Sequence, residues 1–164
     1  SVETVDLASH LTSQLRLILE SERDMRAGEE IIGNLNEEGM LSCDLKEVQV
    51  DLNSWLAEMR LGPQEEIAKL ETDAERSEAK EELDALFSPY SLREIEESLK
   101  IVQSLDPSGV GARDVRETVL IQLNQQGKAE GLAYNLLQNR CRTQQSGPKP
   151  MPNEAMCLRV YLIL

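Results

Sequence analysis

One stretch, LKIVQSLDPSGVGARDVRETVLIQL at residues 99–123, constrains the fold of this chain more than any other. It predicts two amphipathic helices joined by a tight turn. Pro107 disfavours a helical backbone at the residue before it, so the first helix should end near residue 105. Gly109 and Gly111 permit a positive φ or a close approach of two backbones. The stretch therefore predicts a helix-turn-helix-like corner, whose turn, residues 106–114, we call the elbow.

The two helices of the corner are predicted from capping residues and apolar spacing. Ser91 and Glu94 form a capping-box pattern, so the first helix should begin at Leu92. The second helix should begin near Ala112 and end before Gly127, a typical stop residue. Spacings of three and four residues predict one buried stripe on each helix. The stripe residues are Leu92, Ile95, Leu99, Val102 and Leu105, followed by Val115, Val119 and Leu123.

The elbow has three alternative interpretations. The GVG sequence at 109–111 could belong to a dinucleotide-binding GxGxxG, but Asp114 replaces the third glycine and a helix precedes the motif, which disfavours phosphate binding. A DNA-reading helix is the second alternative, with Arg113 and Arg116 as its basic residues. Asp114 and Glu117 offset that charge. The third is a corner whose glycines only let two helices pack.

The distribution of charge bears on the kind of partner. The formal net charge is -13, and residues 1–100 hold 25 acidic and 10 basic residues, against 5 and 7 in residues 101–164. The acidic part would repel a phosphate backbone, so the chain should not bind DNA or RNA on its own. An acidic surface suits a basic protein partner or serves solubility. An aromatic content of 3% favours an all-α fold with an aliphatic core.

Metal, cofactor and membrane chemistry have little support in the sequence. Cys43, Cys141 and Cys157 form no CxxC pair, and His10 is the one histidine, so neither a metal nor a cofactor is expected. No nucleophile signature or specially spaced carboxylate pair suggests an enzyme. The start does not resemble a signal peptide, and no run of about 18 apolar residues could span a bilayer. We therefore expect a cytoplasmic protein.

The first half of the chain is predicted to form acidic amphipathic helices. Residues 7–19 carry a stripe that includes Ile18, and residues 22–36 form a second helix, after which Gly39 can take a left-handed cap conformation. Another, short helix should start at Leu45, capped by Asp44 or Ser42.

A charged stretch separates these helices from the corner. Gly62-Pro63 should break the helix that precedes it. The residues that follow, 64–87, are rich in Glu, Lys and Ala, which predicts a solvated helix or hairpin arm or a charged disordered insertion. The charge run is best interpreted as a solvated face, with an acidic contact surface as the alternative.

Residues 105–123 resemble the segment LDPxGVGARDxxExLLxQL of the core-binding region of the sigma-54 (sigma-N) family of bacterial transcription initiation factors. IIGNLNEEGML at 31–41 resembles a second segment of that family in the same order, although Met40 replaces the usual aromatic residue. The resemblance covers about residues 5–140. The positions that carry it in the corner are Asp106, Pro107, Gly109, Val110, Gly111, Ala112, Arg113, Asp114, Leu120, Gln122 and Leu123.

The resemblance implies an all-α bundle of short amphipathic helices at 1–140, with a charged insertion at about 50–88. Residues 141–164 would be an irregular linker and apolar tail. The implied partner is bacterial core RNA polymerase. An activator ATPase would be contacted only by the rest of a complete factor. Since the family's Gln-rich N-terminal region and its basic promoter-reading box are absent, the chain is interpreted as an isolated or truncated core-binding region.

The resemblance also points to candidate site residues. Arg113 and Arg116 are candidates for charge pairing with acids of the bundle or with polymerase, and the alternative for Arg113 is a salt bridge to Asp114. Asp114 in a first helical turn would suit the helix dipole. Two alternatives to the sigma function remain, a helical protein-interaction module unrelated to transcription and a decoy that occupies polymerase. The candidate partner-binding or elbow residues are Asp106, Pro107, Gly109, Val110, Gly111, Ala112, Arg113, Asp114 and Arg116.

Overall fold

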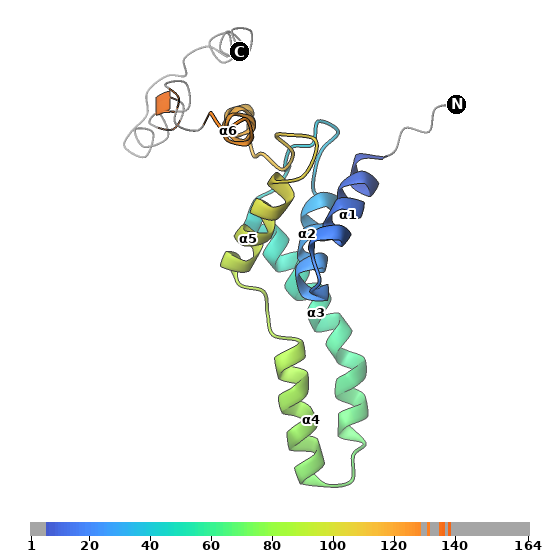
Figure 1. Cartoon of the computed structure of the whole chain (residues 1–164). Helices are drawn as coiled ribbons and strands as arrows, with labels where there is room; N and C mark the ends of the chain where they lie inside the picture. The colour runs from blue at the N-terminus through green and yellow to red at the C-terminus, as the bar shows by residue number, and fades with distance from the viewer. Residues whose placement is uncertain (1–5, 129–130, 132–134, 137, 139–164) are drawn as a thin grey trace, which may run out of the picture.

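The computed structural model describes residues 6–128, 131, 135–136 and 138, and this part of the chain is all-α (Figure 1). The prediction of an all-α fold is confirmed. The predicted tail at 141–164 lies outside the described residues. The helices are α1 (Leu7–Ile18), α2 (Glu22–Gly33), α3 (Leu45–Ala68), α4 (Asp73–Leu86), α5 (Leu92–Gln103) and α6 (Val115–Gln125).

The molecule has a helical bundle and a projecting arm (Figure 1). Helix α2 packs against α1, α3 and α5, and these four helices enclose the core. The arm, which we define as residues 57–86, consists of the distal part of α3 and the antiparallel helix α4. Helix α6 lies at the opposite end of the bundle from the arm.

Aliphatic side chains fill the core, as the low aromatic content predicts. Burying each of them contributes about 1.5–3 kcal/mol relative to exposure. One aromatic residue, Tyr90, is also buried. The largest fully buried side chains are Leu11, Leu15, Ile31, Val48, Leu52, Ile95 and Val102.

Helix α5 begins where its sequence predicts. The Ser91 hydroxyl accepts from the Glu94 backbone N–H at 3.3 Å, and the Glu94 carboxylate accepts from the Ser91 N–H at 2.7 Å. Leu105 is buried just beyond the helix end, so the predicted stripe packs as expected from its spacing. Ile18 of α1 is exposed instead of buried, whereas Leu19, the last residue of the same predicted stripe, packs against the core.

The predicted break at Gly62-Pro63 is wrong, because α3 continues through Pro63 to Ala68. Gly62 has no Cβ to clash with the proline ring. Both residues are exposed, so water can bond the carbonyl of Met59 that Pro63 leaves without a donor. A helix interior tolerates proline here because the arm is surrounded by solvent.

The arm is an ordered helical hairpin, which confirms that alternative over a disordered insertion. A Thr72–Glu75 capping box starts α4, and an Arg76 guanidinium N–H donates to the Leu70 carbonyl at 2.8 Å across the turn. Arg60 of α3 pairs with Asp84 of α4. That the arm is an insertion relative to the family stays a prediction.

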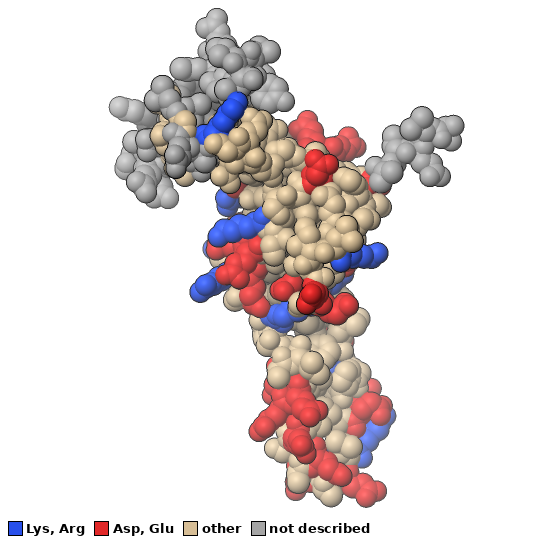
Figure 2. Space-filling view, viewed as in Figure 1, with Lys and Arg blue, Asp and Glu red and all other residues tan. Residues whose placement is uncertain are grey.

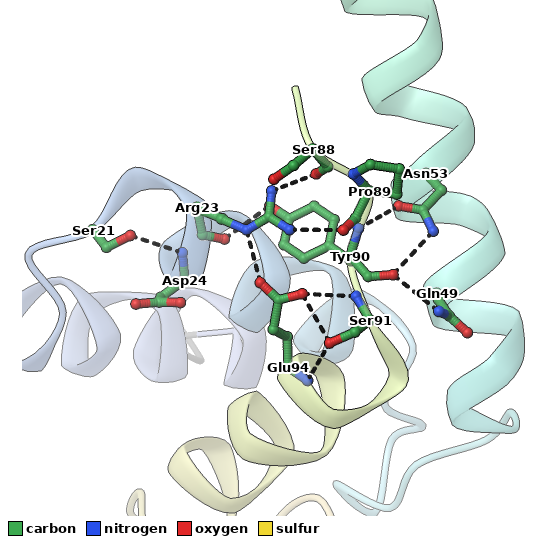
Figure 3. Close-up of polar contacts among 10 residues, drawn as sticks. All are labelled: Ser21, Arg23, Asp24, Gln49, Asn53, Ser88, Pro89, Tyr90, Ser91 and Glu94. Atoms are coloured by element: carbon green, nitrogen blue, oxygen red, sulfur yellow. Dashed lines mark hydrogen bonds and ion pairs between the residues drawn. The ribbon is translucent and has the colours of Figure 1, made fainter. Parts of the chain in front are cut away.

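A polar network holds the base of the arm to the bundle (Figure 3). Arg23 of α2 donates from Nε to Glu94 at 2.9 Å, and from its two Nη atoms to the carbonyls of Ser88 and Pro89 at 2.7 and 3.1 Å. Its guanidinium lies 4.0 Å from the centre of the Tyr90 ring. The segment that returns from α4 to α5 is therefore tied to α2.

Helix α3 holds the same returning segment from its other side. Asn53 accepts from the Tyr90 N–H at 2.7 Å and donates to its carbonyl at 3.2 Å, while Gln49 donates to that carbonyl at 2.9 Å. The Tyr90 hydroxyl donates to the Arg23 carbonyl at 2.9 Å. Together these contacts join α2, α3 and α5 where the arm leaves the bundle.

The network makes stability depend on acid pH through Glu94. Hydrogen bonding to Arg23, helped by Ser91 and opposed by burial, lowers the pKa of Glu94 to about 2, against about 4.3 in an unfolded chain. The stabilisation is complete above the unfolded pKa and is lost as the pH falls towards the folded value. Because the side chain is 41% exposed, solvent screening limits the loss to about 1 kcal/mol.

Urea unfolding of the wild type and of Glu94→Gln at several pH values measures this contribution. The wild type should be more stable at about pH 6, and the difference should shrink towards about pH 3. A difference that is independent of pH would show that the Glu94 charge does not contribute.

Candidate protein-binding site at the elbow

Two glycines give the elbow its shape. Gly109 and Gly111 have φ values of +94° and +76°, a region that other residues rarely adopt. A Cβ at Gly109 would lie 2.7 Å from Thr118 Cγ2 of α6, and one at Gly111 would lie 3.2 Å from Gln103 Cγ of α5. The glycines therefore supply both the backbone conformation and the close helix packing expected from the sequence.

The elbow has a buried side and an exposed side. Val110 and Ala112 are buried, whereas Asp106, Pro107 and Arg113 are exposed. The buried residues anchor the turn, and the exposed ones are accessible to a partner.

The elbow is paired through its backbone with the turn between α2 and α3. The Gly111 N–H donates to the Gly39 carbonyl at 2.8 Å, and the Leu41 N–H donates to the Ala112 carbonyl at 2.9 Å. Gly39 has a φ of +78°, as expected for a left-handed position. The two segments that resemble the sigma-54 family thus meet in space although about seventy residues separate them.

The turn from Asn36 to Met40 is itself held by a side chain. Asn36 Oδ1 accepts from the N–H groups of Glu38 and Met40, each at 3.0 Å, and the Asn36 N–H donates to the Met40 carbonyl at 2.8 Å. The Asn36 side chain therefore stabilises the turn that pairs with the elbow.

Helix α6 begins three residues after the expected start at Ala112. The Ala112 carbonyl accepts a hydrogen bond from the Leu41 N–H, and the Asp114 backbone is extended, with a φ of -153°. The Asp114 carboxylate caps the helix by accepting from the Glu117 N–H at 2.7 Å. Asp114 is thus the N-cap rather than a first-turn residue, where its charge still complements the helix dipole.

Arg113 pairs with Glu117, so the predicted Arg113–Asp114 salt bridge is wrong. Arg113 Nη2 and Nε donate to the two carboxylate oxygens at 2.7 and 2.9 Å. Burial raises the pKa of Glu117, but the Arg113 hydrogen bonds outweigh burial and the net pKa lies below its usual value. Those bonds raise the pKa of Arg113. The Asp114 carboxylate instead caps α6.

The stripe predicted on the second helix is only partly correct. Val119 and Leu123 are buried, but Val115 is 60% exposed. The later helix start places Val115 at the first helical position, beside the elbow and away from the core. Arg116 follows it on α6 and is half-buried.

Two glutamines contribute contacts that sequence reasoning missed. Gln14 of α1 donates to the Asp106 carbonyl at 2.6 Å and accepts from its N–H at 2.9 Å. Gln103 of α5 donates to the Gly111 carbonyl at 3.1 Å. His10 Nε2 lies 3.7 Å from Asp106 Oδ2. No local pattern could reveal the Gln14 contact, because 92 residues separate the partners.

Within the part of the chain that the structure describes, no group of three or more His, Cys, Asp and Glu side chains is placed to hold a metal ion. In that same part, no helix has the length and apolar character needed to cross a membrane.

Comparison with known proteins gives the family of this helical domain. Residues 1–147 match the family model described as "Sigma-54 factor, core binding domain", and the chain belongs to this family. The RNA polymerase sigma-54 factor of Pseudomonas aeruginosa (strain UCBPP-PA14) is 29% identical over 119 residues. The aligned region covers 73% of this chain and 18% of that relative, so the chain spans less than a fifth of the relative's length.

The predicted relation to the sigma-54 family is therefore confirmed. The family is a class of transcription factors that are not enzymes, in agreement with the expectation of a binding protein. The match extends through residues 50–88 and past residue 140. The insertion and the domain boundary near residue 140 remain predictions.

Proposed function

We propose that this chain binds bacterial core RNA polymerase as the core-binding part of a sigma-54-type transcription initiation factor. The family match and the name of the Pseudomonas relative support this function. The structural observation that carries it is the pairing of the elbow with the α2–α3 turn at Gly111–Gly39 and Leu41–Ala112. This pairing makes one rigid, partly exposed surface from both segments that resemble the family.

In this proposal, promoter recognition and contact with an activator ATPase belong to other parts of a complete factor. Residues 1–100 carry 15 more acidic than basic residues, which opposes binding to a phosphate backbone. Such a factor would act in the bacterial cytoplasm, where polymerase is found.

A titration of the labelled chain with purified bacterial core RNA polymerase, at two salt concentrations, tests the proposal. We expect saturable binding in the micromolar range or tighter, and competition by a complete sigma-54 factor. Far-UV circular dichroism on the same sample shows that the chain is folded. A folded chain that does not bind, or that a complete sigma-54 factor does not displace, would refute the proposed function.

A further inference from the structure

The surface beside the elbow contains two adjoining hollows. One, of about 380 Å³, lies between the elbow, the α2–α3 turn and the start of α6, and Met40, Pro107 and Val115 are among its lining residues. The other, of about 390 Å³, lies between α1 and the end of α2, where Leu35 is part of its lining. Leu7 lines both hollows. We call the two together the elbow groove.

Accessible apolar side chains form part of the lining of the elbow groove, and we call this part its apolar floor; Thr118 and Gln122 are among the polar residues of the lining. Val115 is 60% exposed, Pro107 is exposed, and Leu7 and Met40 are half-buried. These side chains come from α1, the α2–α3 turn, the elbow and α6, and the backbone bonds described above hold the turn and the elbow together. A preformed apolar surface built by four separate segments is typical of a protein-interaction site.

The rim of the elbow groove is acidic. Glu37 and Glu38 are exposed and form no ion pair within the described part of the chain, and Asp6 is exposed at the end of the second hollow. Asp106 does not line either hollow but precedes the lining residue Pro107; its side chain is 84% exposed, and His10 Nε2 lies 3.7 Å from its Oδ2. Figure 2 shows acidic side chains gathered at this end of the bundle.

The basic groups near the groove do not neutralise this rim. Arg113 is engaged by Glu117 through two hydrogen bonds, and Arg116 is half-buried on α6. A partner element that carries basic residues would therefore be attracted to the rim, and a nucleic acid would be repelled.

We propose that the elbow groove seats adjacent apolar side chains of a protein element of core RNA polymerase that is flanked by Lys or Arg. The inference rests on the proposed function and names the surface and the partner chemistry. The apolar floor would supply the contact area, and the acidic rim would orient the partner and exclude acidic sequences.

The apolar contact is tested by Val115→Gln, with Val50→Gln as the matched control. Val50 of α3 is 63% exposed and does not line the groove. Glutamine keeps the net charge and is a good helix former, so both variants should fold. Because an amide is costly to bury in an apolar contact, Val115→Gln should weaken polymerase binding by about tenfold or more. Val50→Gln should leave binding unchanged.

The charge contact is tested by reversing Glu37 and Glu38 to Lys together. The control reverses Glu81 and Glu82, an exposed adjacent pair on the arm, and changes the net charge by the same amount. The groove variant should bind about tenfold more weakly at low salt, with a smaller difference at high salt. The arm variant should show a much smaller change.

The outcomes distinguish failure of the groove inference from failure of the proposed function. No wild-type binding would overturn the proposed function, and the groove inference with it. Wild-type binding with equal affinities for each variant and its control would overturn the groove inference alone. Light scattering that shows a wild-type dimer and a Val115→Gln monomer would assign the groove to a second copy of the chain and overturn polymerase as its occupant.

Discussion

Replacing Gly111 with valine should lower the free energy of unfolding by about 3 kcal/mol or more. A non-glycine residue in the left-handed region costs about 1–2 kcal/mol, and a β-branched residue is among the least tolerated there. Its side chain would also press on Gln103, Val102 and Leu99, which lie 3.2–3.5 Å from the position of a Cβ. Overpacking of this kind costs about 1–3 kcal/mol.

Urea unfolding followed by far-UV circular dichroism measures this loss, and Gly33→Val serves as the control. Gly33 ends α2, and a Cβ there would meet no atom within 4 Å. We expect a change of about 0.5 kcal/mol or less for the control. Similar stability changes in the two variants would show that the elbow conformation is not critical. If Gly111→Val remains folded, it should bind polymerase more weakly, because the Gly111–Gly39 bond positions the elbow.

Replacing Arg23 with alanine should lower the free energy of unfolding by about 2–3 kcal/mol. The substitution leaves Glu94 without its cation, removes the donors to the Ser88 and Pro89 carbonyls, and removes the guanidinium from the Tyr90 ring. The segment between α4 and α5 should lose the most local stability, because Arg23 holds it on one side and α3 holds it on the other.

Thermal and urea unfolding of three variants test the role of Arg23. Arg93→Ala is the control, since Arg93 forms an exposed ion pair with Glu97 within α5, and its loss should cost about 0.5 kcal/mol or less. Arg23→Lys should recover only part of the stability, because an ammonium cannot reproduce the planar set of donors. Full recovery by lysine would mean that charge alone matters, contrary to the network geometry.

Local features of the chain were predictable because they depend on neighbours within one or two helical turns. The capping box of Ser91 and Glu94 and the apolar stripe of α5 involve spacings of three or four residues, and the cap at Asp44 reaches only two residues along the chain. The positive φ values at Gly109 and Gly111 follow from the one residue type that adopts them freely.

The wrong predictions arose where the surroundings outweighed a local preference. Pro63 does not end α3, because the arm is exposed and the preceding residue is glycine. Val115 belongs to the apolar spacing of its helix, but Asp114 caps α6 later than expected and leaves that side chain beside the elbow groove. Arg113 pairs with Glu117, one helical turn away, while the Asp114 carboxylate caps α6.

The sequence by itself determined the all-α class, most of the helix boundaries, the glycine-dependent turn and, through its resemblance, the sigma-54 family. Only the tertiary structure decided that the elbow pairs with Gly39 and Leu41, that Gln14 binds Asp106, and that Arg23 ties the base of the arm to the bundle. These contacts join residues 65–92 positions apart. Helical periodicity reports which face of a helix is buried, but packing of whole helices decides which distant polar groups meet on that face.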